Sequence, residues 1–190
     1  MQAKQANASR SAEITSMWGL IETVADMEGR VGQIYTGFAK MFSSRPRVVE
    51  FWQEAAADER MHALLIGATR EVFTASTPAP NGKWSTQLKK LDGLVKGVEA
   101  ELQMGLPLVD ALSRAEAIER SELGMMTALI LGRAEAAFSR FRRLRKLWRV
   151  DAHAEKLAHA RARFCGRGGE QARARRQACP PRKSPRKAGL

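Results

Sequence analysis

The chain has 190 residues, of which 44% are hydrophobic and only one is tyrosine, so it suits one compact helix-rich domain and argues against a β protein. Its formal net charge of +12 would favour a nucleic-acid binder, but residues 164–190 alone contribute eight Lys/Arg against one acid. The rest of the chain is therefore only mildly basic.

Cysteine usage and hydropathy exclude further classes. Cys165 and Cys179 lack the Cys-x-x-Cys spacing of a zinc or iron–thiolate site, and they make no disulfide framework. Residues 1–8 lack the apolar core of a signal peptide. The longest apolar stretch, 125–131, is far shorter than the roughly 20 residues that cross a bilayer. We therefore expect a soluble cytoplasmic protein with no membrane contact.

The first half of the chain predicts two long helices. Residues 1–12 are small and polar and are expected to form a flexible N-terminus. Apolar residues then recur at three- and four-residue steps. This pattern predicts one helix from about residue 12 until the break at 43–46, and a second helix over 46–73.

Acids and a histidine interrupt the apolar inner faces of both helices. Glu28 lies in the first stripe, and Glu59 and His62 lie in the second. The Glu-x-x-His spacing places both side chains on one face of a helix, where they can hold one metal ion together. A buried carboxylate is costly unless it is paired or bound to metal, so these positions predict a site. For Glu28 the alternative is a boundary residue paired with Arg30 or with a neighbouring helix.

The second half begins with a crossover. Turn residues over 75–82 end the first half, and an amphipathic segment over 85–104 is expected to be partly helical. A third helix is predicted over 107–131, with Glu119 and Glu122 one turn apart on or beside its inner face. Gly132 is expected to make a short turn.

A fourth helix is predicted from about residue 134 to 163, and it carries His153. We interpret the basic run in its first half as a solvated face, with a binding patch as the alternative. Residues 165–190 are rich in Gly, Arg, Pro and Lys and are expected to be a disordered tail. The predicted organisation is thus a short N-terminus, one helical domain over 13–164 and this basic tail.

An internal repeat relates the two helix pairs. An offset of 91 residues places Glu28 on Glu119 and His62 on His153. A two-fold arrangement of helical hairpins would bring all four to the centre of a bundle. One Glu from each of two helices, with Glu-x-x-His from each of the other two, is the ligand set of carboxylate-bridged dinuclear sites.

The repeat is incomplete at one position. The same offset places Glu59 on Val150, so the fourth helix offers His153 without its partner acid. Asp151 is adjacent but is rotated by about 100° around the helix. Glu122 is the candidate substitute, and the second metal position is expected to be the weaker one.

These motifs resemble those of a known family. Glu28 is followed seven residues later by Tyr35 in a Tyr-x-x-Phe-Ala context, then by Glu-x-x-His at 59–62, and a Glu-x-x-Glu pair stands at 119–122. Over about residues 13–163 the chain resembles the rubrerythrin branch of the ferritin-like superfamily. The resemblance implies an all-α, ferritin-like four-helix bundle of two helical hairpins, often a homodimer, that binds two non-haem iron ions.

The activity that the resemblance implies is reduction of hydrogen peroxide or oxidation of ferrous iron by oxygen. The metal ligands would be Glu28, Glu59, His62, Glu119, Glu122 and His153. Since the chain has no Cys-x-x-Cys pair, it lacks the rubredoxin module of many relatives and would need an external electron donor.

Two other functions stay open at this stage. Val150 favours a bundle that binds a single metal ion, or that serves as a non-catalytic binding protein or scaffold. The basic tail favours weak, sequence-independent contact with nucleic acid through phosphate groups. It offers no aromatic residues for base stacking.

Overall fold

The computed structural model of the chain describes residues 14–80, 84–121, 123–137 and 150–166, with only the backbone at 137 and 150–154. Within these ranges every named element is a helix, and the extended structure is limited to an isolated bridge between Ser16 and Pro78. The all-α class predicted from the sequence is confirmed. No described helix is both long enough and apolar enough to span a lipid bilayer.

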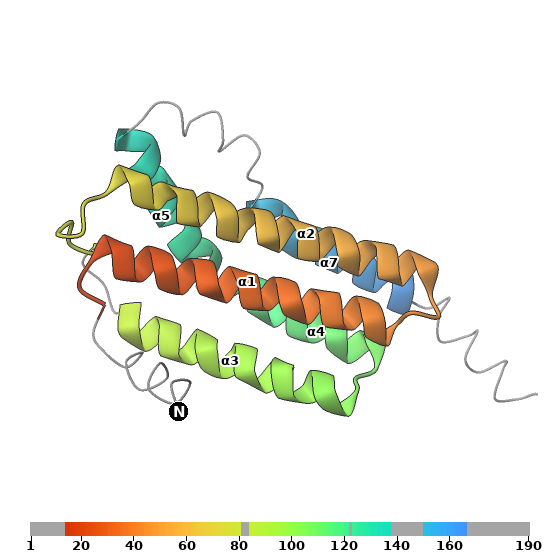
Figure 1. Cartoon of the computed structure of the whole chain (residues 1–190). Helices are drawn as coiled ribbons and strands as arrows, with labels where there is room; N and C mark the ends of the chain where they lie inside the picture. Colours follow the sequence, from red (N-terminus) through yellow and green to blue (C-terminus); the bar gives the residue numbers. More distant parts are fainter. Residues whose placement is uncertain (1–13, 81–83, 122, 138–149, 167–190) are drawn as a thin grey trace, which may run out of the picture.

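Two long helices form the hairpin that organises the molecule. α1 (Met17–Met41) and α2 (Pro46–Ala68) run antiparallel, side by side along the length of the structure (Figure 1). The Ser16 hydroxyl caps α1 by accepting a hydrogen bond from the Gly19 N–H at 3.2 Å. Pro46 stands in the first turn of α2, where its missing N–H leaves no hydrogen bond unmade. The short 3-10 helix η3 (Thr69–Val72) then ends this half close to the predicted boundary.

The hairpin buries one continuous apolar face. Each of its fully buried large side chains stabilises the fold by about 1.5–3 kcal/mol relative to exposure. The aromatic rings of Tyr35, Phe38 and Trp52 pack together across the two helices, with centroids 4.9–6.4 Å apart. The core therefore surrounds the stretch of the hairpin in which Glu28 and Glu59 lie.

The crossover is a full helix. α3 (Trp84–Met104) flanks α1, and Gly105 ends it in a left-handed conformation with φ of 85°. The Arg30 guanidinium of α1 donates to Glu99 at 2.9 Å and to Asp92 at 2.7 Å, which fixes α3 against α1. Arg30 thus pairs with the crossover and not with Glu28, so the first alternative for Glu28 is wrong.

The third helix is broken where the sequence predicted it to be continuous. α4 (Leu108–Glu119) ends one residue before Arg120, and α5 (Leu123–Ala137) begins after it. The Ser121 hydroxyl accepts a hydrogen bond from the Leu123 N–H at 3.3 Å, so a local side chain replaces the helical partner of that N–H. Glu119 is therefore the last residue of α4, and Glu122 lies outside the described residues.

The predicted turn at Gly132 is also wrong. Gly132 lies inside α5, which continues to Ala137. A side chain at this position would meet nothing within 4 Å, so Gly132 lies on an open face of the helix. A glycine costs a helix about 1 kcal/mol relative to alanine, a penalty that packing elsewhere on α5 outweighs.

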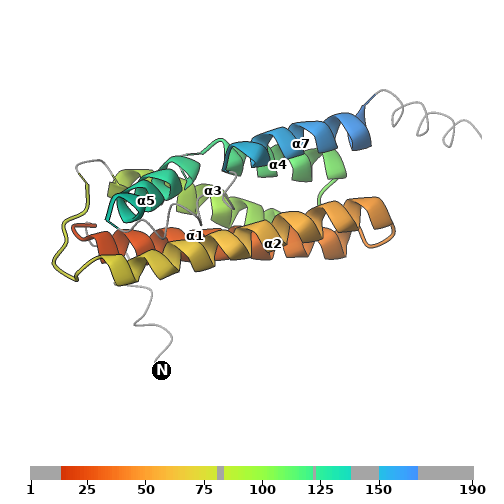
Figure 2. The same cartoon turned by 90° about the horizontal axis from the view of Figure 1, so that it is seen from above.

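α7 (Val150–Cys165) lies beside α4, and the two helices together cover one face of the α1–α2 hairpin (Figure 2). Lys156 forms an ion pair with Asp58 of α2 at 2.6 Å, and the Phe164 ring packs against Phe51 at 6.0 Å. The first part of the predicted fourth helix, 138–149, and most of the predicted tail, 167–190, lie outside the described residues. The complete bundle of two hairpins stays a prediction.

Candidate metal centre

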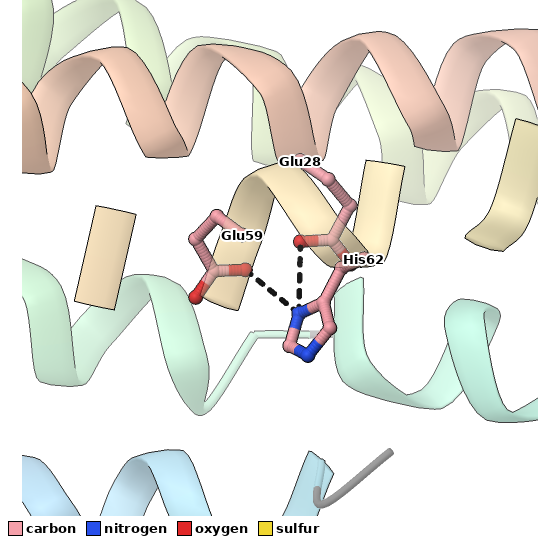
Figure 3. A group of neighbouring side chains, drawn as sticks. All are labelled: Glu28, Glu59 and His62. Atoms are coloured by element: carbon pink, nitrogen blue, oxygen red, sulfur yellow. Dashed lines mark hydrogen bonds and ion pairs between the residues drawn. The ribbon is translucent and has the colours of Figure 1, made fainter. Parts of the chain in front are cut away.

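Glu28 of α1 and Glu59 and His62 of α2 meet inside the hairpin (Figure 3). One ligand atom from each lies within 4.8 Å of the others. The Nδ1 atom of His62 is 2.9 Å from Glu59 Oε2 and 3.9 Å from Glu28 Oε2. The three residues that the two apolar stripes singled out are therefore brought together by the fold.

A glycine lets the two helices approach at this point. Gly32 lies one turn after Glu28 on the same face of α1, and a Cβ atom there would be 3.3 Å from Glu59 Cβ and 3.4 Å from the Ala56 carbonyl oxygen. These separations are tighter than most Cβ contacts. The absent side chain of Gly32 thus sets the distance between the helix that carries Glu28 and the helix that carries Glu59.

Gly32→Ala is expected to lower metal affinity by about tenfold, because Glu59 must shift by a few tenths of an ångström and small displacements around a metal site have effects of this size. Gly29→Ala is the matched control on the same helix, since its Cβ would meet nothing within 4 Å. The control should keep the affinity and gain up to about 1 kcal/mol of stability from helix propensity. Titration with Co²⁺ and urea unfolding measure both quantities. Equal affinities in the two variants would contradict the role given to Gly32.

The cluster is almost completely shielded from water. The exposed fractions are 3% for Glu28, 2% for Glu59 and 8% for His62. Burial raises the pKa of the Glu28 carboxyl well above its ordinary value, and the charge and hydrogen bond of Glu59 raise it further. His62 and Thr127 act in the opposite direction but do not cancel this effect. Without a cation, the Glu28 carboxyl therefore holds its proton to a higher pH than an exposed glutamate does.

Thr127 is a site residue that the sequence analysis missed. Its hydroxyl, on α5, donates to Glu28 Oε1 at 2.8 Å, and its side chain is buried. The bond orients the carboxylate and leaves Oε2 to face His62. The only signal in the sequence was a single polar residue inside the apolar stretch 125–131. The second alternative for Glu28, pairing with a neighbouring helix, is therefore confirmed for one of its two oxygens, Oε1.

Glu119 lies beside the cluster and not among its three closest ligands. Its Oε1 accepts a hydrogen bond from the Tyr35 hydroxyl at 2.7 Å. Tyr35 is fully buried, and burial, followed by the charge of Glu119, raises its pKa, so the hydroxyl stays a donor. Tyr35 therefore bonds a carboxylate of the predicted ligand set.

Tyr35 and Glu119 line a small cavity between α2, α4 and α7, of about 20 Å³. Asp58 and Lys156, which pair with each other, line it too. This volume suffices for about one water molecule. Tyr35 lines this cavity and also lies close enough to Glu28 and Glu59 for their charges to raise its pKa.

The remaining predicted ligands are not described. Glu122 lies outside the described residues, and His153 is described only as part of the backbone of α7. The same holds for Val150, the position that breaks the internal repeat. The roles of Glu119, Glu122 and His153 as metal ligands stay predictions.

The three gathered side chains fit a divalent transition-metal ion. One ligand atom from each lies within 4.8 Å of the others, so the three donors could hold one ion between them. Imidazole and carboxylate together suit iron, manganese, cobalt and zinc. Such an ion would also offset the cost of burying the two carboxylates.

Comparison of the chain with protein-family models, with curated proteins and with solved structures finds no match. The function therefore has to be argued from the buried cluster and its surroundings.

Proposed function

We propose that this protein binds non-haem iron through Glu28, Glu59 and His62. The observation that carries the proposal is the burial of two carboxylates and an imidazole in one group, with ligand atoms within 4.8 Å of one another. Buried carboxylates without a cation are costly, and burial accordingly raises the pKa of the Glu28 carboxyl. A bound cation would offset the cost of burying both acids.

The finer proposal is a rubrerythrin-type oxidoreductase in a ferritin-like bundle. Glu119, beside the cluster on Tyr35, would serve a second iron position together with Glu122 and His153. Bound iron would supply the electron transfer to peroxide or oxygen, and the electrons would come from an external donor. The internal repeat and the motif around Glu28 support this proposal.

The protein's own groups have defined tasks in such a site. The core around Glu28, Glu59 and His62 excludes bulk water and strengthens the attraction between carboxylates and cation. Thr127 holds one oxygen of Glu28, and Tyr35 holds one oxygen of Glu119. The cavity beside Tyr35 offers room for one small molecule close to the cluster.

The second candidate function is a binding protein for one metal ion without turnover. Val150 in place of a Glu favours it, because the repeat then supplies the second position with one acid fewer. The three donors of the first position come together in the described residues, so a mononuclear site would be expected to form even where the second does not.

Anaerobic reconstitution with ferrous iron separates these functions. The oxidoreductase requires two irons per chain and an oxo-bridge absorption after addition of peroxide. The binding protein requires one iron per chain and no such band. A chain that retains no stoichiometric metal after desalting would contradict both.

A further inference from the structure

A basic groove lies at the end of the molecule where α2 begins and α7 ends, away from the metal cluster. Both helix ends lie at the same end of the structure (Figure 1). The groove has a volume of about 470 Å³, and three of its six lining residues are arginines. They are Arg45 and Arg47, at the start of α2, and Arg163, near the end of α7.

The three arginines carry uncompensated charge. In the part of the chain that the structure describes, none of the ion pairs involves them, and no carboxylate lines the groove. Some other described arginines are paired with acids, such as Arg30 with Asp92 and Glu99, and Arg161 with Glu116. Three unpaired guanidinium groups around one hollow repel each other, so this arrangement suits an anion in the groove.

Packing fixes the groove walls. The Phe164 ring lies against Phe51 of α2, with centroids 6.0 Å apart, and the Arg163 guanidinium lies over the Phe164 ring at 5.4 Å. Arg163 is thereby held near the start of α2 by contacts that belong to the fold. The positive end of the α2 dipole adds to the potential of the arginines in the same sense.

We propose that this groove binds the phosphate backbone of nucleic acid. Guanidinium groups match phosphate oxygens in pairs of hydrogen bonds, and three of them lining one groove offer contacts to more than one phosphate group. The sequence supports a polymer, because eight more Lys/Arg follow within residues 167–187, directly after the groove residue Phe164. Recognition through phosphates alone is independent of base sequence.

The test compares two triple variants of the full-length chain that lose the same charge. One is Arg45→Gln/Arg47→Gln/Arg163→Gln, and the control is Lys89→Gln/Lys90→Gln/Arg133→Gln, at exposed positions of α3 and α5. Both keep residues 167–190. Binding of a fluorescent DNA duplex of about 20 base pairs is followed by anisotropy over a range of NaCl concentrations.

The groove variant should bind the duplex at least about tenfold more weakly at low salt, and its salt slope should fall by up to about 2.7, or 0.9 for each lost phosphate contact. The control should keep most of the affinity and the slope. An Arg→Lys triple variant at the groove positions keeps the charge but loses the paired hydrogen bonds, so it should keep the salt slope of the parent and bind more tightly than the Gln variant but more weakly than the parent, which guards against a folding defect. Equal losses in groove and control variants would overturn the proposal, as would a parent that binds anionic lipid vesicles but no DNA.

Discussion

Replacing His62 by alanine is expected to lower the affinity for Fe²⁺ or Co²⁺ by about 100-fold or more. Loss of a residue that merely supports a ligand costs about 10–100-fold in affinity, and His62 supplies the only nitrogen donor of the described cluster. Its Nδ1 faces both carboxylates, so no other described atom takes its place. The visible absorption of bound Co²⁺ reports the change directly.

His159→Ala is the matched control for this variant. His159 is exposed on α7 and belongs to no described ligand group, so its removal should leave both affinity and spectrum unchanged. If the two histidine variants bind Co²⁺ equally well, the metal is held elsewhere and the cluster is only a buried hydrogen-bonded group.

Glu28→Gln is expected to act in opposite directions on metal binding and on stability. The amide removes a ligand charge and should abolish stoichiometric metal binding. It should also stabilise the metal-free protein at pH 8 by about 1–3 kcal/mol, since a neutral side chain replaces a buried acid. The amide oxygen can still accept the hydrogen bond from Thr127.

The pH dependence follows from the raised pKa of Glu28. The ordinary value is 4.5, and the folded value is higher because of burial and of Glu59. Between the two values the folded protein holds a proton that the unfolded chain releases, so the free energy of unfolding falls as the pH rises through this window. In Glu28→Gln that fall should be absent, and below pH 4.5 the advantage of the variant should disappear.

Urea unfolding of the chelator-treated protein at several pH values measures this effect. Glu50→Gln, at an exposed position of α2, provides a control that should shift the whole curve by less than about 0.5 kcal/mol. A Glu28→Gln protein that is less stable than the parent at pH 8 would mean that the carboxylate is charged and well paired in the metal-free state.

The first hairpin could be predicted because its signals are local. Apolar spacing, the Pro46 break and the acids at 28 and 59 all act within one or two turns of helix, so the sequence exposes them. The burial of Glu28 and Glu59 followed from their position in apolar stripes. Their convergence with His62 needed only two helices packed inner face to inner face.

The second half depended on contacts that no local pattern contains. The helix breaks after Glu119, where the Ser121 hydroxyl takes the place of a backbone carbonyl as hydrogen-bond acceptor for Leu123. Gly132 has a lower helix propensity than serine, and yet it lies within a helix. Thr127 reaches Glu28 only because α5 packs across the hairpin. Tyr35 and Glu119 meet across a separation of 84 positions in the sequence.

The three described donors come from one short part of the chain, and this has a consequence for the order of folding. Glu28, Glu59 and His62 all come from one hairpin, and the only connection between them is the turn after α1. Hairpins of neighbouring helices form early, because closing a short loop is fast and costs little entropy. During synthesis this hairpin leaves the ribosome before α4, α5 and α7 exist. We therefore expect the hairpin to bind the metal ion during synthesis. The later helices would then pack over a site that already holds the ion.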